Sequence, residues 1–281
     1  MGILRAIKLT WIICIFIGTG FITEIASAGV LLYGTTSNGD SGTSTLVLLN
    51  TDDWENPDEI GPVGYLVNGM AWDYQTQSLY ASTSTNDPAF TGLIVIDRAT
   101  GVGTAVSTSD WGQGAGFSVS NITIDSDGNM VGWADNTNQL VAIDKETGEI
   151  TQFIDTSVSA AEFGLSYAKY NLLYLVNNGD SGDLYVFVDE DQDFTDGPSV
   201  GYEGRQGDFH PTTNLYYGID HTGTDTRSLV TIYVAGDEDN FQETFETVDQ
   251  LHTLAFAVTR SGSSGNGDSG ICFIRSITNT D

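Results

Sequence analysis

The chain has 281 residues, and its 38 acidic residues far outnumber its 9 lysines and arginines, for a formal net charge of −29. A surface this acidic repels a phosphate backbone, which argues against nucleic acid as a partner. It suits an exported protein that stays soluble, binds Ca²⁺ or meets a cationic surface, and solubility alone is the simplest explanation.

The amino terminus has the pattern of a secretory signal peptide. Arg5 and Lys8 precede an apolar run over 9–22, and a small-residue cleavage site ends at Ala28. The run is short and interrupted for a permanent transmembrane helix, although an uncleaved anchor is the alternative. We therefore predict a signal peptide over 1–28 and a secreted, periplasmic or cell-surface protein with no stable membrane span after cleavage.

From residue 30 onward the chain repeats a unit of four short runs rich in β-branched and aromatic residues. Gly, Asn, Asp, Ser and Thr separate the runs, as is typical of strands joined by turns. One position marks the second run of each unit, and successive marked positions are 47, 50, 44 and 42 residues apart. This spacing is close to the roughly 40–45 residues of a four-stranded propeller blade. These positions are Tyr33, Tyr80, Met130, Tyr174 and Tyr216. No segment keeps a helical apolar period for three turns, so almost no helix is expected.

The first unit lacks a first strand, because "VLLYGTTS" starts directly after the expected signal peptide. The run "LHTLAFAV", Leu251–Val258, matches a first strand and has no second strand after it. We therefore predict that it completes the first blade, since a closed ring hides edges that an open array exposes. The expected fold over 29–259 is all-β: a five-bladed propeller of four-stranded antiparallel blades, with four or six blades as alternatives.

The recurring "LIVIDRATG" and "LVAIDKETG", with "SLYAS" and "NLYYG" upstream, resemble secreted bacterial β-propellers of the broad quinoprotein-like and YVTN-like type. The resemblance covers most of 30–258 and implies this fold without a particular activity. It implies no quinone cofactor, because the tryptophan-rich blade motifs of the proteins that hold one are missing. Asp97 and Asp144 begin the repeated turns, and we expect them to accept hydrogen bonds inside the turn.

An acidic run, "DEDQDFTDG", places carboxylates at alternate positions, as Ca²⁺ loops do at their start. Phe194 stands where such a loop needs glycine, and Val200 stands where it needs glutamate, so this is no EF-hand. Ca²⁺ is the candidate cofactor, and a solvated hairpin tip is the alternative. The candidate metal ligands are Asp189, Asp191, Asp193 and Asp196.

Polar residues near the start of the first strands are candidate ligand or channel residues, because the innermost strands of a propeller line its central channel. They are Asn68, Asn121, Gln206 and His252. His210, at the end of a first strand, is a further candidate, since imidazole binds metals and transfers protons. The histidine spacing matches no zinc motif and no nucleophile elbow accompanies it, so we predict no catalytic residue. A channel that holds only water, and histidines without a shared role, are the alternative.

The composition changes at Ser261, and 260–281 is predicted to be a flexible Ser/Gly-rich tail. The letters "CFI" after its glycine run resemble short C-terminal tails of some exported bacterial proteins. Cys272, the cysteine that remains after signal cleavage, is a candidate for surface attachment or intermolecular pairing. A simple exposed thiol is the alternative.

These observations favour a non-catalytic binding or cell-surface interaction module whose partner is a protein, a glycan or a small molecule. Two other classes stay open: a Ca²⁺-dependent hydrolase or lactonase-like enzyme with its site in the propeller mouth, and a structural surface or matrix component. The enzyme needs carboxylates and an imidazole that converge in one mouth. The sequence offers these residue types without a diagnostic spacing.

Overall fold

The computed structural model describes most of the chain between residues 29 and 259. The described ranges are 29–37, 42–50, 53–83, 87, 90–106, 110–134, 137–158, 164–176, 183–188, 193–199, 204–220, 228–233, 242–246 and 251–259. Ala28–Arg260 form one compact unit. The expected signal peptide and tail lie outside the described residues, so both stay predictions.

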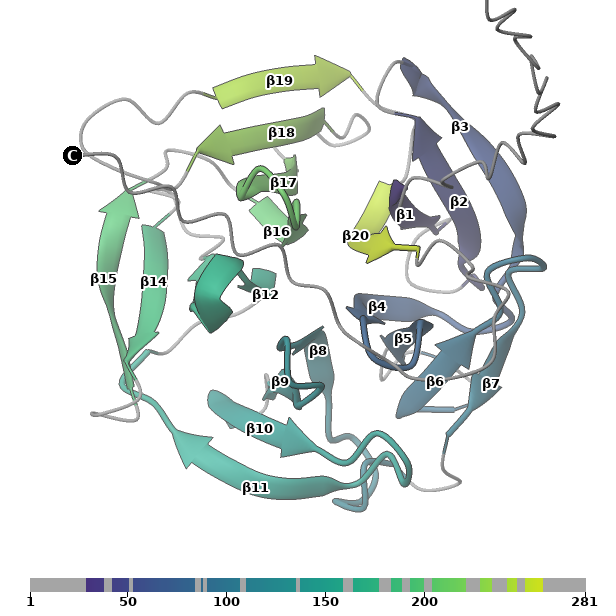
Figure 1. Cartoon of the computed structure of the whole chain (residues 1–281). Coiled ribbons are helices and arrows are strands. Elements are labelled where there is room, and N and C mark those ends of the chain that lie inside the picture. Colours follow the sequence, from purple (N-terminus) through teal and green to yellow (C-terminus); the bar gives the residue numbers. More distant parts are fainter. Residues whose placement is uncertain are drawn as a thin grey trace, which may run out of the picture. The chain divides into compact units, whose positions relative to one another are not determined.

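The described strands form five antiparallel sheets of four strands each, arranged as blades around a common centre (Figure 1). From the centre outward, the first blade contains β20 (Leu251–Val258), β1 (Val30–Thr36), β2 (Thr45–Asn50) and β3 (Asp53–Pro62). The second contains β4 (Val67–Asp73), β5 (Ser78–Thr83), β6 (Leu93–Ile96) and β7 (Gly103–Ala105). The third contains β8 (Val119–Ile124), β9 (Met130–Ala134), β10 (Gln139–Ile143) and β11 (Ile150–Asp155).

The last two blades follow the same order. The fourth contains β12 (Gly164–Tyr167), β13 (Leu173–Val176), β14 (Asp183–Val188) and β15 (Asp193–Ser199). The fifth contains β16 (Gly204–Phe209), β17 (Leu215–Asp220), β18 (Ser228–Tyr233) and β19 (Gln242–Glu246). The prediction of an all-β, five-bladed propeller is therefore confirmed.

The C-terminal strand closes the first blade, as the sequence pattern predicted. β20 pairs antiparallel with β1 from Val30 opposite Val258 to Thr36 opposite Leu251. The last described strand thus supplies the innermost strand of the blade that begins the ring. In Figure 1 the yellow β20 lies beside the purple β1 at the centre.

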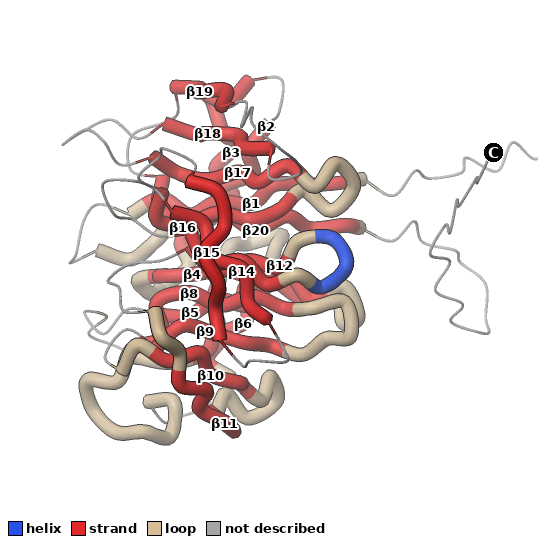
Figure 2. Tube along the Cα trace, turned by 90° about the vertical axis from the view of Figure 1, so that its left-hand side faces the viewer, coloured by secondary structure: helices blue, strands red, loops and turns tan. Residues whose placement is uncertain are grey.

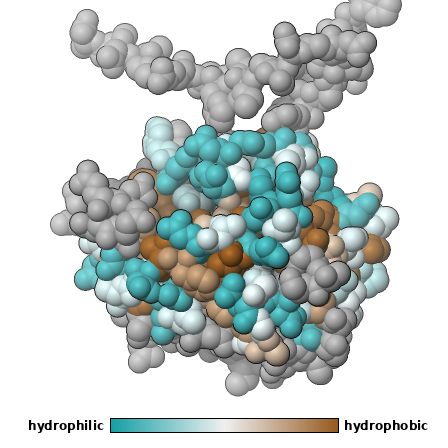
Figure 3. Space-filling model, turned by 90° about the horizontal axis from the view of Figure 1, so that it is seen from below, coloured by the Kyte–Doolittle hydropathy of each residue, from teal (hydrophilic) through white to brown (hydrophobic). Residues whose placement is uncertain are grey.

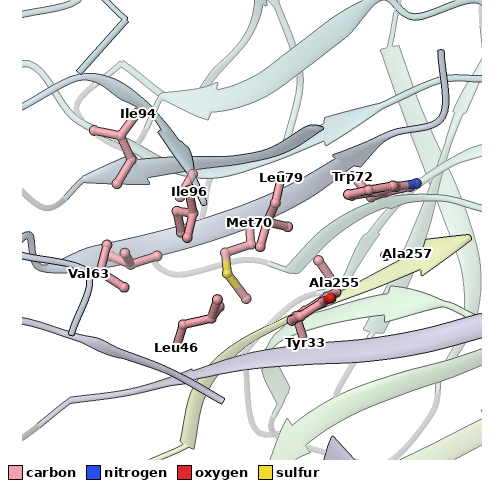
Figure 4. Packing of buried hydrophobic residues seen from close by; sticks show 12 residues of the cluster. Tyr33, Leu46, Val63, Met70, Trp72, Leu79, Ile94, Ile96, Ala255 and Ala257 are labelled. Carbon is pink, nitrogen blue, oxygen red and sulfur yellow. The ribbon is translucent and has the colours of Figure 1, made fainter. Parts of the chain in front are cut away.

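Burial explains why the inner strands have long apolar runs. Every residue of β8 is buried, and so are six of the seven residues of β4, because an inner strand is covered by the blades on both sides. One apolar cluster joins the first and second blades, where Tyr33, Leu46 and Ala255 pack with Met70 and Leu79 (Figure 4). The outer strand β11 is mostly exposed.

One short 3₁₀ turn, η1 (Lys169–Asn171), joins β12 to β13. It stands at the right-hand edge of the strands in side view (Figure 2). In the part of the chain that the structure describes, no helix has the length and hydropathy needed to cross a membrane.

Candidate interaction face

Three polar side chains link consecutive inner strands around the centre of the ring. Thr123 Oγ1 on β8 accepts a hydrogen bond from the backbone N–H of Tyr167 on β12, at 3.2 Å. Ser166 Oγ on β12 accepts from the N–H of Phe209 on β16, at 3.3 Å. The next link, from β16 to β20, uses Asp208. Each polar group therefore satisfies a backbone donor of the following blade.

Asp208 joins three blades, including the one that closes the ring. Its Oδ1 accepts hydrogen bonds from Ser166 Oγ at 2.6 Å and from the N–H of Phe209 at 2.8 Å. Its Oδ2 accepts from the N–H of Phe256 on β20, at 2.8 Å. This carboxylate thus holds the C-terminal strand against the fifth blade.

The protein surrounds Asp208, and burial raises its pKa to about 6 even though its three hydrogen bonds favour the ionised form. Asp208 nevertheless keeps partial exposure. Burial raises the pKa of Tyr74 and of Tyr216, and the charge of Asp208 raises both further by a smaller amount. No ion pair joins Asp208 to a cation within the described residues.

Gln206 crosses the ring near the start of the inner strands. Its Nε2 donates to the backbone carbonyl of Ser120 at 3.1 Å, although the fourth blade separates β16 from β8 in the ring. Asn121 on β8 is 2% exposed and lies against Gly69 on β4. A Cβ atom at Gly69 would stand 2.8 Å from Asn121 Cα, so only glycine allows the two strands to approach this closely. Asn121 is therefore packed against the neighbouring second blade, and Gln206 is bonded to the third blade across the ring.

Asn68 and His252 lie where the pairing of an inner strand shifts by one residue. The register of β4 shifts between Val67 and Gly69, and that of β20 shifts where it meets Thr35 and Thr36 of β1. Both side chains are partly exposed. All four predicted channel residues thus fall at the starts of inner strands, and their role as ligand contacts stays a prediction.

His210 closes the turn after β16. Its Nδ1 accepts hydrogen bonds from the N–H groups of Thr212 and Thr213, at 3.2 and 3.1 Å. This geometry assigns the proton of the neutral ring to Nε2. The ring packs edge-to-face on Phe256 with 4.9 Å between centroids, and burial lowers the pKa of His210.

Aspartates have the turn-closing role of His210 in two other blades. Asp73 Oδ1 accepts from the N–H groups of Gln75 and Thr76, and Asp125 Oδ1 accepts from those of Asp127 and Asn129. His210 therefore stands in a structural position of the repeat. That equivalence is visible in the sequence, where "MAWD", "ITID" and "GDFH" each end a first strand.

A buried ion pair joins the second and third blades, and sequence analysis missed it. Lys145 Nζ, in the hairpin between β10 and β11, donates to Oδ2 of the fully buried Asp73. Burial alone raises the pKa of Asp73, but hydrogen bonds from Lys145, Gln75 and Thr76 outweigh it and lower the pKa below its ordinary value.

The turns after β4, β8, β12 and β16 surround the centre of the ring in Figure 1, and we call them the turn face. They comprise 74–77, 125–129, 168–172 and 210–214. Side chains connect three of them. Gln75 Nε2 donates to Ser126 O at 3.5 Å, and the N–H of Ser126 donates to Asn171 Oδ1 at 3.1 Å.

The most exposed large apolar side chains of the turn face lie at η1. Tyr170 is 83% exposed, and Leu172 is 43% exposed. Tyr170 and Asn171 both have left-handed backbone, with φ of 71° and 59°. Such backbone is costly outside glycine and persists where the surrounding contacts hold it. Sequence analysis did not single out Tyr170, because "KYN" matches no recognition motif.

The repeated Asp turns form as expected. Asp97 Oδ1 accepts from the N–H groups of Ala99 and Thr100, and Asp144 has the same bonds in its own hairpin. These backbone donors lower the pKa of both aspartates. A structural role in the turn therefore accounts for both aspartates.

The acidic hairpin of the fourth blade is described only in part. Asp193 Oδ1 accepts from the N–H groups of Ser157 and Phe194, both at 2.8 Å, and the bond from Ser157 is the main cause of its lowered pKa. Asp196 lies three residues along β15, so it points to the opposite side of the strand.

The other predicted ligands, Asp189 and Asp191, lie outside the described residues, as does Cys272. No group of three His, Cys, Asp or Glu side chains that could hold a metal occurs within the described ranges. The Ca²⁺ site and the attachment role of Cys272 therefore stay predictions.

The fold defines the chain as a five-bladed β-propeller, which confirms the expected resemblance at the level of the fold. No protein family and no curated protein sequence matches it. Among solved structures, a chain of the nidogen/laminin complex is similar, with a TM-score of 0.54 and 11% identity over 82% of this chain and 98% of that chain.

Two further solved structures resemble the chain more distantly. A protein of unknown function from Bacteroides caccae has a TM-score of 0.47 and 11% identity over 82% of this chain and 99% of its own. TolB from Acinetobacter baumannii has a TM-score of 0.49 and 12% identity over 79% of this chain and 53% of its own.

Proposed function

We propose that the chain is an exported, acidic, non-catalytic binding module that recognises its partner, a protein or a glycan, with the turn face. The observation that carries this proposal is Tyr170, which is 83% exposed on a left-handed backbone beside the exposed Leu172. The bond from the N–H of Ser126 to Asn171 Oδ1 fixes the turn to the next blade. A tyrosine in a fixed turn loses little freedom on binding and is a frequent source of interface energy.

The inner strands support the same role. The polar groups of Thr123, Ser166, Asp208 and Gln206 are engaged in bonds between blades. His210 closes a turn through Nδ1. These side chains act as connections of a rigid platform, which favours recognition by surface residues.

A solved structure gives an analogy of fold. The similar chain in the nidogen/laminin structure belongs to a protein complex, and at 11% identity the likeness extends to the fold alone. The likeness in fold supports a role as a rigid platform for binding. The identity of the partner is inferred only from the surface of this chain.

A binding array tests the proposal. The probes are printed bacterial surface glycans and a fixed set of synthetic peptides, applied to the wild-type chain and to Tyr170→Ala. We expect Tyr170→Ala to weaken the strongest interaction by tenfold or more, on the order of 1.4 kcal/mol. The matched control is Val102→Ala, which truncates another exposed apolar side chain, in the hairpin between β6 and β7. An interaction that Tyr170→Ala leaves unchanged would contradict the turn-face proposal.

A second experiment separates the binding module from the hydrolase. Lactone, ester and glycoside substrates are assayed with added Ca²⁺, using the wild-type chain and His210→Asp. Asp closes the equivalent turns at Asp73 and Asp125, so this variant should fold normally while it lacks the imidazole. Turnover that His210→Asp abolishes would overturn the non-catalytic assignment.

A further inference from the structure

Each four-stranded blade has two edge strands, and the inner one faces the centre of the ring, so the edges that face outward belong to the outermost strands. Those strands are β3, β7, β11, β15 and β19. An outer edge presents unpaired backbone N–H and C=O groups to any extended chain that approaches it. Natural sheets protect such edges with short strands, proline, charged residues and bulges.

Four of the five outer strands carry such devices in their sequence or length. β3, "DWENPDEIGP", has two prolines, four acidic residues and two shifts of register. β7 is three residues long, and its Gly103 N–H donates to Val63 O at 2.9 Å. β15, "DFTDGPS", contains a proline and two aspartates, and β19, "QETFE", contains two glutamates.

β11 has the least of this protection. Its sequence, "ITQFID", contains no proline and no charge before its last residue, Asp155. The register shift affects only its start, where the N–H of Ile150 donates to Trp111 O at 3.5 Å. From Thr151 to Asp155 no further strand pairs with β11 in the described residues. These five residues therefore form an accessible edge.

An aromatic side chain stands in the middle of this edge. Phe153 is 40% exposed, and its ring packs edge-to-face on Phe117 with 6.0 Å between centroids. Thr151 and Gln152 beside it are also exposed. Seen from below, the side on which Figure 1 places β11, an apolar strip crosses a largely hydrophilic surface (Figure 3). Phe153 can thus supply apolar contact to a chain that pairs with the edge.

The charge of the third blade's sequence, and of the two ends of β11, selects the kind of partner. Residues 119–155 contain seven acidic residues and one basic residue, Lys145, which is paired with Asp73. The acidic residues are Asp125, Asp127, Asp135, Asp144, Glu146, Glu149 and Asp155. Glu149 and Asp155 are exposed at the two ends of the strand. A partner with basic residues at both ends is therefore favoured.

A second copy of the chain fits this edge poorly. Two antiparallel β11 strands in register would place Ile150 opposite Asp155 and so bring Asp155 close to Glu149 of the other copy. The formal charge of −29 on each copy adds repulsion over a longer range.

We propose that β11 binds an extended peptide segment of another protein, apolar in its middle and basic at both ends, as a fifth strand of the third blade. Backbone hydrogen bonds give this mode its affinity, and alternate side chains give it specificity. The proposal extends the binding role of the molecule and uses a surface that does not include Tyr170.

Three synthetic peptides test it against the full exported chain by fluorescence anisotropy. KVTVTVK is the basic strand-former, EVTVTVE reverses its charge, and KPTPTPK keeps the charge but cannot pair as a strand. We expect KVTVTVK to bind at least tenfold more tightly than either control. Phe153→Lys should weaken it by at least tenfold, because it adds a charge and removes the ring. Thr195→Lys, at an exposed position of β15, should change binding less than twofold.

Hydrogen exchange locates the contact, with protection by KVTVTVK expected at 151–155. Equal binding of KPTPTPK would mean charge attraction alone and would overturn the proposal. Protection outside 151–155, or no detectable binding of KVTVTVK, would also overturn the proposal. The same holds if Phe153→Lys and the wild type have the same melting temperature and bind KVTVTVK equally well. Tyr170→Ala should bind KVTVTVK normally, so loss of this proposal alone leaves the turn-face function standing.

Discussion

At the residue scale, Asp208 shows how one largely buried carboxylate can connect several blades. It accepts hydrogen bonds from Ser166, Phe209 and Phe256, on three consecutive inner strands. The bonds to N–H and O–H groups compensate part of the cost of burial, and the pKa of about 6 shows that compensation is incomplete. Its charge is therefore linked to the stability of the closed ring.

Asp208→Asn should change how stability depends on pH. Because the pKa of Asp208 is raised from 3.8 to about 6 on folding, its contribution is greatest below pH 4 and is lost as the pH rises through 6. Urea unfolding from pH 4 to pH 7 measures this. The stability of the wild type relative to Asp208→Asn should fall by roughly 2 kcal/mol across this range.

Asp193→Asn provides the contrast of opposite sign. The N–H of Ser157 lowers the pKa of Asp193, so its contribution is present at neutral pH and is lost as the pH falls through the lowered pKa. The same slope for both variants would contradict the roles assigned to these two carboxylates.

At the scale of elements, the structure shows which features the sequence could predict. The strands, the turns at Asp97 and Asp144 and the closing role of β20 depend on local patterns that repeat along the chain, and these formed as expected. The bond from Gln206 to Ser120 and the ion pair of Lys145 with Asp73 depend on distances across the ring, which no local pattern encodes.

Two residues of the candidate site could have been found with a sharper comparison of the repeats. Asp208 stands where the other inner strands carry a small or hydroxyl residue, such as Ser166 in "LSYA". Tyr170 stands two residues beyond the turn-closing position, where the other turns have the polar residues Gln75, Asp127 and Thr212. The positions of both side chains could still not be predicted without the packed ring, because both are held by contacts with adjacent blades.

The contact between β4 and β8 gives a prediction for an element interface. Gly69→Ala places a Cβ 2.8 Å from Asn121 Cα and 3.0 Å from Ser120 O, and both contacts are to backbone. The inner strands must shift apart, so we expect a loss of about 1–3 kcal/mol in the free energy of unfolding.

Gly29→Ala is the matched control for this interface, because its nearest contact, Thr259 Oγ1, lies at an ordinary 3.6 Å. Equal unfolding midpoints in urea for the two variants would show that β4 and β8 do not approach as closely as described.

At the scale of the whole molecule, the ring fixes both proposed surfaces. The turn face is built from turns of four blades, and Gln75, Ser126 and Asn171 connect three of them. β11 lies at the outer edge of one blade. A rigid platform of this kind can present separate surfaces to separate partners, which is how propellers serve many functions.

The chain forms one closed ring in which the last described strand completes the first blade. Deletion of Leu251–Val258 removes every backbone bond between β20 and β1 and the bond from Phe256 to Asp208. Deletion from Ser261 onward leaves all the described strands in place. The measurement is thermal unfolding of both truncated chains beside the full chain, followed by circular dichroism. We expect the first deletion to abolish the cooperative transition and the second to preserve it, and a first deletion that melts like the full chain would contradict closure of the ring by β20.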